Sequence, residues 1–250
     1  MGGCRLISII IILSCSAFAL TESMSLHYEN GLDAYRNNQY DLAIQEFETI
    51  LDNNWGSPEL YYNLGNAYYR NGNTGGAVWA YENSLRVSPN NVDAEYNLKL
   101  ANLKVKDRVD LPDPPIYLKW YMGIKEHYTP SIWINITLFI LLLFSLTATI
   151  LRILSADSLN YIRGMFVTLF FCSLFITLHS IWTLHSVSPG IVYYTAIEAR
   201  SEPNQFSARL FEVHEGLKVS VNQTSENWME IELLDGKTGW VKNDQIRLIQ

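Results

Sequence analysis

Three patterns of hydrophobic and polar positions follow one another along the chain, and each predicts a different architecture. Residues 24–106 carry a helical pattern that recurs after 34 residues. The stretches 132–154 and 164–184 are apolar along their length and are long enough to cross a membrane, which takes about 20 helical residues. From residue 190 onward, apolar and polar residues alternate, as they do in short β-strands.

The recurring pattern resembles the tetratricopeptide repeat, which has small residues at its eighth and twentieth positions and an aromatic residue at its twenty-fourth. Small residues let the two antiparallel helices of one repeat approach closely, and the aromatic ring fills the gap beside them. We expect repeats over 24–57 and 58–91, with a capping helix over 92–106. The pairs that match at an offset of 34 are Tyr28 with Tyr62, Gly31 with Gly65, Ala43 with Ala77, and Phe47 with Tyr81.

The resemblance implies a concave groove lined by the first helix of each repeat. An aromatic groove with two arginines suits an extended peptide. Asn66 is placed to form hydrogen bonds with the backbone of such a peptide. In the other interpretation, which stays open, these tyrosines and asparagines are consensus residues of the solenoid. Two repeats and a cap form a marginal solenoid, so a partner or self-association is expected to complete it. The candidate groove residues are Tyr28, Tyr35, Arg36, Tyr62, Asn66, Tyr69, Arg70 and Tyr96.

The N-terminus has the pattern of a secretory signal peptide over 1–19. Arg5 precedes a short apolar run, and Ala17 and Ala19 stand at the −3 and −1 positions of a signal-peptidase site. A lipoprotein signal that ends at Cys15 is the alternative, although the residues before this cysteine fit that motif poorly.

The two apolar stretches predict a transmembrane hairpin whose short loop, 155–163, lies in the cytoplasm. Arg152 and Arg163 flank this loop, and positively charged residues favour the cytoplasmic side of a membrane. The repeats and the C-terminal region would then both lie outside the cytoplasmic (inner) membrane, on the periplasmic side. This topology agrees with the signal peptide.

Residues 107–130 form a link in which prolines precede interleaved aromatic and basic residues. Such a mixture favours the headgroup layer of a membrane, which predicts a short interfacial helix on the outer leaflet. An ordinary loop is the alternative.

The alternating pattern of 190–250 predicts five short strands in a small barrel. The order of its motifs resembles the bacterial SH3-like domain. These motifs are Ala-Arg-Ser-Glu-Pro at 199–203, Glu-Gly-Leu-Lys-Val at 215–219, Asn-Trp-Met-Glu-Ile at 227–231 and Asp-Gly-Lys-Thr-Gly-Trp-Val at 235–241. Tyr194, Trp228 and Trp240 could form an aromatic face for an extended peptide. Alternatively, both tryptophans belong to the core of the barrel.

Composition and missing motifs narrow the function classes. Lys, Arg, Asp and Glu make up 17% of the chain, compared with about 25% in typical soluble proteins. With a net charge of −7 and no basic cluster, the chain is not expected to bind nucleic acid. The sequence contains no nucleophile elbow, zinc-protease motif, Cys-x-x-Cys pair or dinucleotide-binding loop. We therefore expect no catalytic residues, no metal site and no cofactor.

The whole arrangement describes a multidomain membrane protein: all-α tetratricopeptide repeats, a two-helix transmembrane hairpin and a small all-β SH3-like barrel. Together with a signal peptide, this order resembles the BatE proteins of the bacterial aerotolerance operon. The resemblance implies an inner-membrane accessory protein that works beside von Willebrand A-domain membrane proteins and a MoxR-type ATPase. The leading hypothesis is a non-catalytic scaffold for protein partners. The alternative is a wall-sensing or wall-anchoring protein whose barrel binds peptidoglycan peptides.

Overall fold

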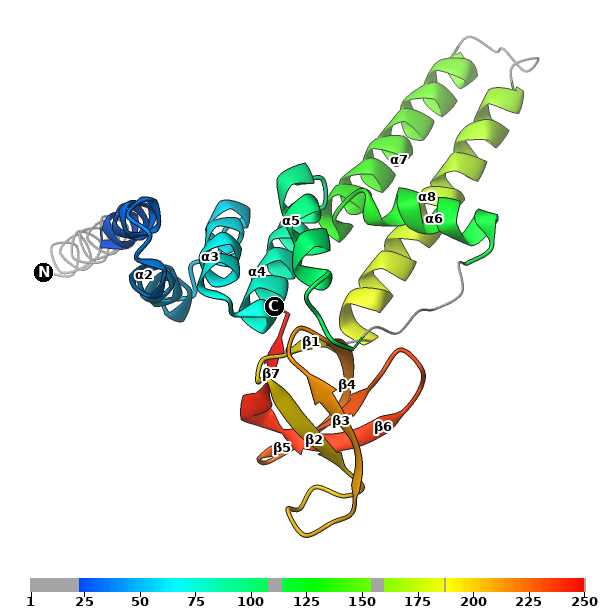
Figure 1. Cartoon of the computed structure of the whole chain (residues 1–250). Helices are drawn as coiled ribbons and strands as arrows, with labels where there is room; N and C mark the ends of the chain where they lie inside the picture. The colour runs from blue at the N-terminus through cyan, green and yellow to red at the C-terminus, as the bar shows by residue number, and fades with distance from the viewer. Residues whose placement is uncertain (1–22, 108–113, 154–159, 187, 250) are drawn as a thin grey trace, which may run out of the picture.

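The computed structural model describes residues 23–107, 114–153, 160–186 and 188–249, and it has the predicted multidomain architecture. Helical repeats, a long helical hairpin and a β-barrel follow one another along the chain (Figure 1). The predicted signal peptide, 1–19, and most of the predicted cytoplasmic loop, 155–163, lie outside the described residues.

The repeat region is a series of antiparallel helices. A helix over 23–36 precedes α2 (Tyr40–Asp52), α3 (Pro58–Asn71), α4 (Thr74–Val87) and α5 (Val92–Asn102). Gly31 and Gly65 allow the two helices of each repeat to pack closely. A Cβ atom at Gly31 would lie 2.5 Å from the ring of Phe47, and one at Gly65 would lie 2.6 Å from the ring of Tyr81. The close approach predicted from the repeat pattern is therefore present in both repeats.

Local sequence signals set the ends of these helices. The side chains of Ser57, Asn73 and Asn91 cap the N-termini of α3, α4 and α5 by accepting hydrogen bonds from backbone N–H groups. Such caps satisfy donors that the first helical turn leaves without partners. At the other end of α3, Gly72 adopts φ +83°, a left-handed conformation that glycine enters without steric cost.

The predicted link and apolar stretches form three helices: α6 (Ile116–Glu126), α7 (Pro130–Ile153) and α8 (Asn160–Ser186). By length and composition, α7 and α8 are able to cross a membrane. The hydroxyls of Thr137 and Thr177 lie 2.9 Å apart where the two helices pack. The hydroxyl of Tyr121 on α6 lies 2.6 Å from Nδ1 of His179 on α8, so the link is a helix held against the hairpin.

The C-terminal region is an antiparallel sheet that curls around its own core, with seven strands in the described residues where the sequence predicted five. The strand order is β3-β2-β6-β5-β4-β1-β7. Val192, Ile231 and Val241 are fully buried in the core. The strands are β1 (Ser188–Val192), β2 (Ala196–Arg200), β3 (Arg209–His214), β4 (Lys218–Ser225), β5 (Trp228–Glu232), β6 (Thr238–Lys242) and β7 (Ile246–Leu248), with a 3₁₀ turn, η2 (Asn243–Gln245), before β7.

The barrel packs against the second helices of the repeats. Ile191 and Ile249 of the barrel belong to the same buried cluster as the repeat helices. The indole Nε1 of Trp79 on α4 donates a hydrogen bond of 2.7 Å to the backbone oxygen of Leu248. Gly75 permits this approach, because a Cβ there would lie 2.7 Å from a backbone oxygen of β1. The chain's own barrel therefore covers part of the surface that the short solenoid would otherwise expose.

Arg247 on β7 lies at the centre of this contact. Its guanidinium donates to both carboxylate oxygens of Glu48 at 2.8 and 2.6 Å, and it lies 3.4 Å from the ring centroid of Trp79. Burial alone would lower the pKa of Arg247, but the hydrogen bonds and negative charge of Glu48 outweigh burial and raise it. The arginine thus remains charged and joins the barrel to α2 and α4 at once.

Candidate functional site

The eight predicted groove residues, here called the repeat groove, lie on the first helices of the repeat pairs: the helix over 23–36, α3 and α5. The barrel's contacts through Glu48 and Trp79 are on the second helices, α2 and α4. Most of the repeat groove therefore stays half-exposed, and Tyr96 at its end is 62% exposed.

Polar groups in the middle of the repeat groove are largely bound to one another. The amide oxygen of Asn66 accepts hydrogen bonds from the Tyr81 hydroxyl at 2.7 Å and from Asn97 at 2.9 Å. The Tyr28 hydroxyl accepts a hydrogen bond of 2.8 Å from Asn63. Burial raises the pKa of Tyr28 and of Tyr81, so both stay neutral at physiological pH. Asn66 is therefore first a structural residue that ties α3 to α4 and α5.

The basic residues of the repeat groove lie at its edge. The hydrogen bond between Arg70 and Tyr35, which belongs to the preceding repeat, raises the pKa of the Arg70 guanidinium. Arg36 is exposed and forms an ion pair of 2.8 Å with Asp33. The ammonium group of Lys104, which is not among the predicted groove residues, lies 3.7 Å from the ring centroid of Tyr69. Lys104 follows Arg70 by 34 residues, as Arg70 follows Arg36. The repeat offset could have identified this third basic position.

A second candidate site is a cavity of about 640 Å³ on the barrel, here called the barrel groove. It lies between the β2–β3 loop, the β4–β5 turn and η2. Phe206, in the β2–β3 loop, is 91% exposed. This loop lies at the end of the molecule opposite the α7–α8 hairpin (Figure 1). The lining residues are Pro203, Asn204, Gln205, Phe206, Asn227, Trp228, Lys242, Asn243 and Asp244.

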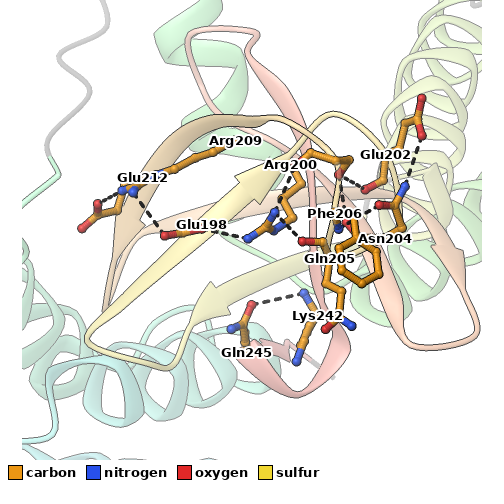
Figure 2. Close-up of polar contacts among 11 residues, drawn as sticks. Glu198, Arg200, Glu202, Asn204, Gln205, Phe206, Arg209, Glu212, Lys242 and Gln245 are labelled. Carbon is orange, nitrogen blue, oxygen red and sulfur yellow. Dashed lines mark hydrogen bonds and ion pairs between the residues drawn. The ribbon is translucent and has the colours of Figure 1, made fainter.

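The loop that carries Phe206 is held in one shape by its own hydrogen bonds (Figure 2). Arg200 donates to the backbone oxygens of Gln205 at 2.8 Å and Ser207 at 2.9 Å. The side-chain oxygen of Asn204 accepts a hydrogen bond of 2.9 Å from the backbone N–H of Phe206. An aromatic ring presented by such a preorganised loop loses little conformational entropy on binding.

The predicted aromatic face of the barrel is only partly assembled. Trp228 and Trp240 are half-buried and share the outward face of β5 and β6, because Trp228 pairs with Lys242 and Trp240 with Glu230. Only Trp228 lines the barrel groove. Tyr194 is exposed in the segment between β1 and β2 and is not among the lining residues.

Phe206 is not among the predicted site residues, because it lies in a loop, outside the alternating pattern that predicts the strands. The available signal was a single aromatic residue within the polar stretch from Ser201 to Ser207. Both grooves offer rings, amides and charged side chains, which suit recognition of an extended chain. Within the described residues, no group of three or more His, Cys, Asp or Glu side chains is placed to hold a metal ion.

Comparison with known families agrees with this division of the chain. Residues 28–98 match the family model described as tetratricopeptide repeat. Residues 194–247 match the model described as bacterial SH3 domain. A search of curated proteins finds no match for the chain. Domains of these two kinds typically bind other molecules without catalysing a reaction, which supports a protein-interaction or wall-binding role.

Proposed function

We propose that this protein is a non-catalytic, membrane-anchored scaffold that holds partners outside the cytoplasm. The observation that carries the proposal is the placement of its two candidate sites. The barrel is fixed to the second helices of the repeats by Arg247 and Trp79. The repeat groove and the barrel groove therefore remain accessible on one body at the same time.

The proposed orientation places the α7–α8 loop in the cytoplasm and both grooves on the other side of the membrane. Arg152 and Arg163, at the loop end of the hairpin, support it through the charge bias of cytoplasmic loops. Reporters fused after residues 158 and 250 test it. A cytoplasmic signal at 158 and an extracytoplasmic signal at 250 are expected, and the reverse pattern would contradict the topology.

The order of modules supports a BatE-like role, in which the partners include von Willebrand A-domain membrane proteins and a MoxR-type ATPase system. These identities rest on the resemblance of the whole architecture. Co-purification from native membranes tests them. If A-domain proteins are absent from complexes that still contain other envelope proteins, the BatE-like assignment is wrong and the scaffold function stands.

Site-specific photo-crosslinking tests the scaffold directly. A photoreactive phenylalanine at Tyr96 probes the repeat groove, one at Phe206 probes the barrel groove, and one at Lys237 is the control. Lys237 lies in the exposed turn before β6 and forms a local ion pair with Asp235. We expect discrete protein adducts at Tyr96 and Phe206 only. Adduct patterns identical to the control at both positions would contradict the proposal.

A second candidate function is binding of peptidoglycan peptides by the barrel groove. The amide side chain of Asn227, which lines it, can bind a peptide backbone, and the β2–β3 loop that forms one wall lies at the end opposite the hairpin. The test is sedimentation of the full-length protein with purified sacculi. If the protein sediments strongly with the sacculi, and the variants F206S and W228A do not, the result would favour wall binding. Failure to sediment would leave proteins as the ligands of this groove.

A further inference from the structure

A cavity of about 610 Å³ lies where the four parts of the chain meet, and we call it the junction cavity. Arg86 of α4, Lys125 of α6, Thr183 of α8 and Ile249 of the barrel contribute to its walls. Thr183 is the last residue of the second candidate span, and Pro130, also in the wall, begins the first. If α7 and α8 cross a bilayer, the junction cavity therefore lies at the level of the lipid headgroups.

The charged groups in its wall are three carboxylates and three cations. Two of the carboxylates already have partners: Glu82 is 2.7 Å from Lys218, which also lines the cavity, and Glu95 is 2.5 Å from Lys99. That leaves Arg86, Lys125 and Glu126. Within the part of the chain that the structure describes, none of these three takes part in an ion pair.

Two cations and one carboxylate are the complement of a group that carries one phosphate and one ammonium. A phosphodiester between Arg86 and Lys125 would form charge-assisted hydrogen bonds, the stronger class of such bonds. The carboxylate of Glu126 would accept from a primary ammonium, whereas it would repel a second anion. Choline is positively charged but presents no N–H donor, so it would leave Glu126 without a charge-assisted hydrogen bond. A glycerol headgroup presents no positive charge, so it would leave Glu126 without a charged partner.

Hydroxyl groups face the same cavity from the membrane side. Ser180 and Thr183, on α8, line it, and the Thr183 hydroxyl donates to the backbone oxygen of Ser180 at 3.0 Å. The oxygen of Thr183 thus keeps its capacity to accept a hydrogen bond. The same helix exposes the apolar side chains of Leu178 and Trp182, so a ligand with a charged head and hydrocarbon chains fits both the cavity and the hairpin.

We propose that the junction cavity binds the headgroup of a phospholipid that bears a phosphate and a primary ammonium, as phosphatidylethanolamine does. Because repeats, link, hairpin and barrel each supply part of the wall, this lipid fixes the extramembrane unit against the membrane surface. The site is independent of the two grooves and of the identity of any protein partner.

Native mass spectrometry of the full-length protein in detergent tests the proposal. The probes are phosphatidylethanolamine, phosphatidylglycerol and phosphatidylcholine with the same acyl chains, and soluble glycerophosphoethanolamine. We expect phosphatidylethanolamine to bind at least about tenfold more tightly than each of the others. Equal affinity for the three lipids would overturn the headgroup assignment. Soluble headgroup that binds as tightly as the lipid would overturn the membrane assignment.

Variants locate the site. The double variant R86Q/K125Q is expected to weaken phosphatidylethanolamine binding by about tenfold or more, and E126Q should narrow the gap between phosphatidylethanolamine and phosphatidylglycerol. K237Q, in the exposed turn before β6 and not among the residues that line the junction cavity, is the matched control and should bind as the parent does. Thermal unfolding without lipid checks that each variant is folded. Unchanged affinity in the folded double variant would contradict the proposal.

Discussion

The guanidinium of Arg247 lies 3.4 Å from the ring centroid of Trp79, although the two residues belong to different modules. The same guanidinium binds Glu48 through two hydrogen bonds. One side chain of the last strand therefore contacts both second helices of the repeats. This contact decides which surfaces of the repeats are covered and which remain free.

Replacing Arg247 by alanine should weaken the joint between barrel and repeats. The change removes the cationic partner of Glu48, a half-buried carboxylate that also accepts a hydrogen bond from Tyr68, and it exposes the face of Trp79. Loss of a charge-assisted hydrogen-bonded pair of this kind costs about 2 to 3 kcal/mol. The measurement is the thermal unfolding of the full-length protein in detergent, with protease sensitivity of the segments that join the modules.

The matched control is Arg209→Ala, because Arg209 forms exposed ion pairs with Glu198 and Glu212 within the barrel. Exposed pairs contribute little, so this variant should change the free energy of unfolding by about 0.5 kcal/mol or less. Equal effects of the two substitutions would show that Arg247 does not join the modules.

The close packing of the second repeat predicts a large effect of a small change at Gly65. A Cβ there would lie 2.6 Å from the ring of Tyr81, which is itself fully buried. Gly65→Ala should therefore destabilise the repeats by about 1 to 3 kcal/mol through overpacking. Gly123→Ala is the control: α6 leaves open space around Gly123, and alanine favours helix by about 1 kcal/mol. A stabilising Gly65→Ala would contradict the observed helix packing.

Buried tyrosines make the repeats sensitive to high pH. Burial, followed by the charge of Glu48, raises the pKa of Tyr68, and burial, followed by Tyr62, raises that of Tyr81. A tyrosine raised in this way contributes stability that is complete below its unfolded pKa of 10.0 and is lost as the pH rises through the folded pKa. The unfolding temperature should therefore fall as the pH rises above about 10.

Tyr81→Phe should reduce this dependence on pH, because the variant has one fewer tyrosine to ionise. Tyr117→Phe, in the exposed part of α6, should leave the slope unchanged. Unfolding temperatures between pH 8 and 11, measured on the full-length protein, give the comparison. The same slope in the parent and in the Tyr81 variant would contradict the role of burial.

Periodic features were predictable from the sequence, and contacts between modules were not. Gly31 and Gly65 identified the repeats because one steric requirement recurs after 34 residues. The hairpin was equally clear, since its length and apolar composition leave few alternatives. By contrast, Trp79 and Arg247 are distant in sequence, and each on its own has the pattern of an ordinary helix or strand residue. Only the tertiary packing of β7 on α4 brings them together.

In the candidate sites too, periodic positions were predictable from the sequence and tertiary contacts were not. The positions of Tyr28, Tyr62 and Tyr96 on first helices follow from the repeat. The engagement of Asn66 with Tyr81 and Asn97 does not, because it depends on side-chain geometry across three helices. The barrel groove was foreseen at Trp228 alone. Its shape comes from the β2–β3 loop, whose conformation is fixed by hydrogen bonds to Arg200 and Asn204.

If one molecule offers two independent binding surfaces, as we propose, matched variants of the two surfaces should lose different partners. The full-length protein would be purified from crosslinked membranes as the parent, as Arg70→Glu and as Phe206→Ser, with Lys237→Gln as the control. We expect Arg70→Glu to remove one set of partners and Phe206→Ser to remove another, while each variant keeps the set lost by the other. If both variants lose the same partners, or if neither differs from the control, the two-surface scaffold is contradicted.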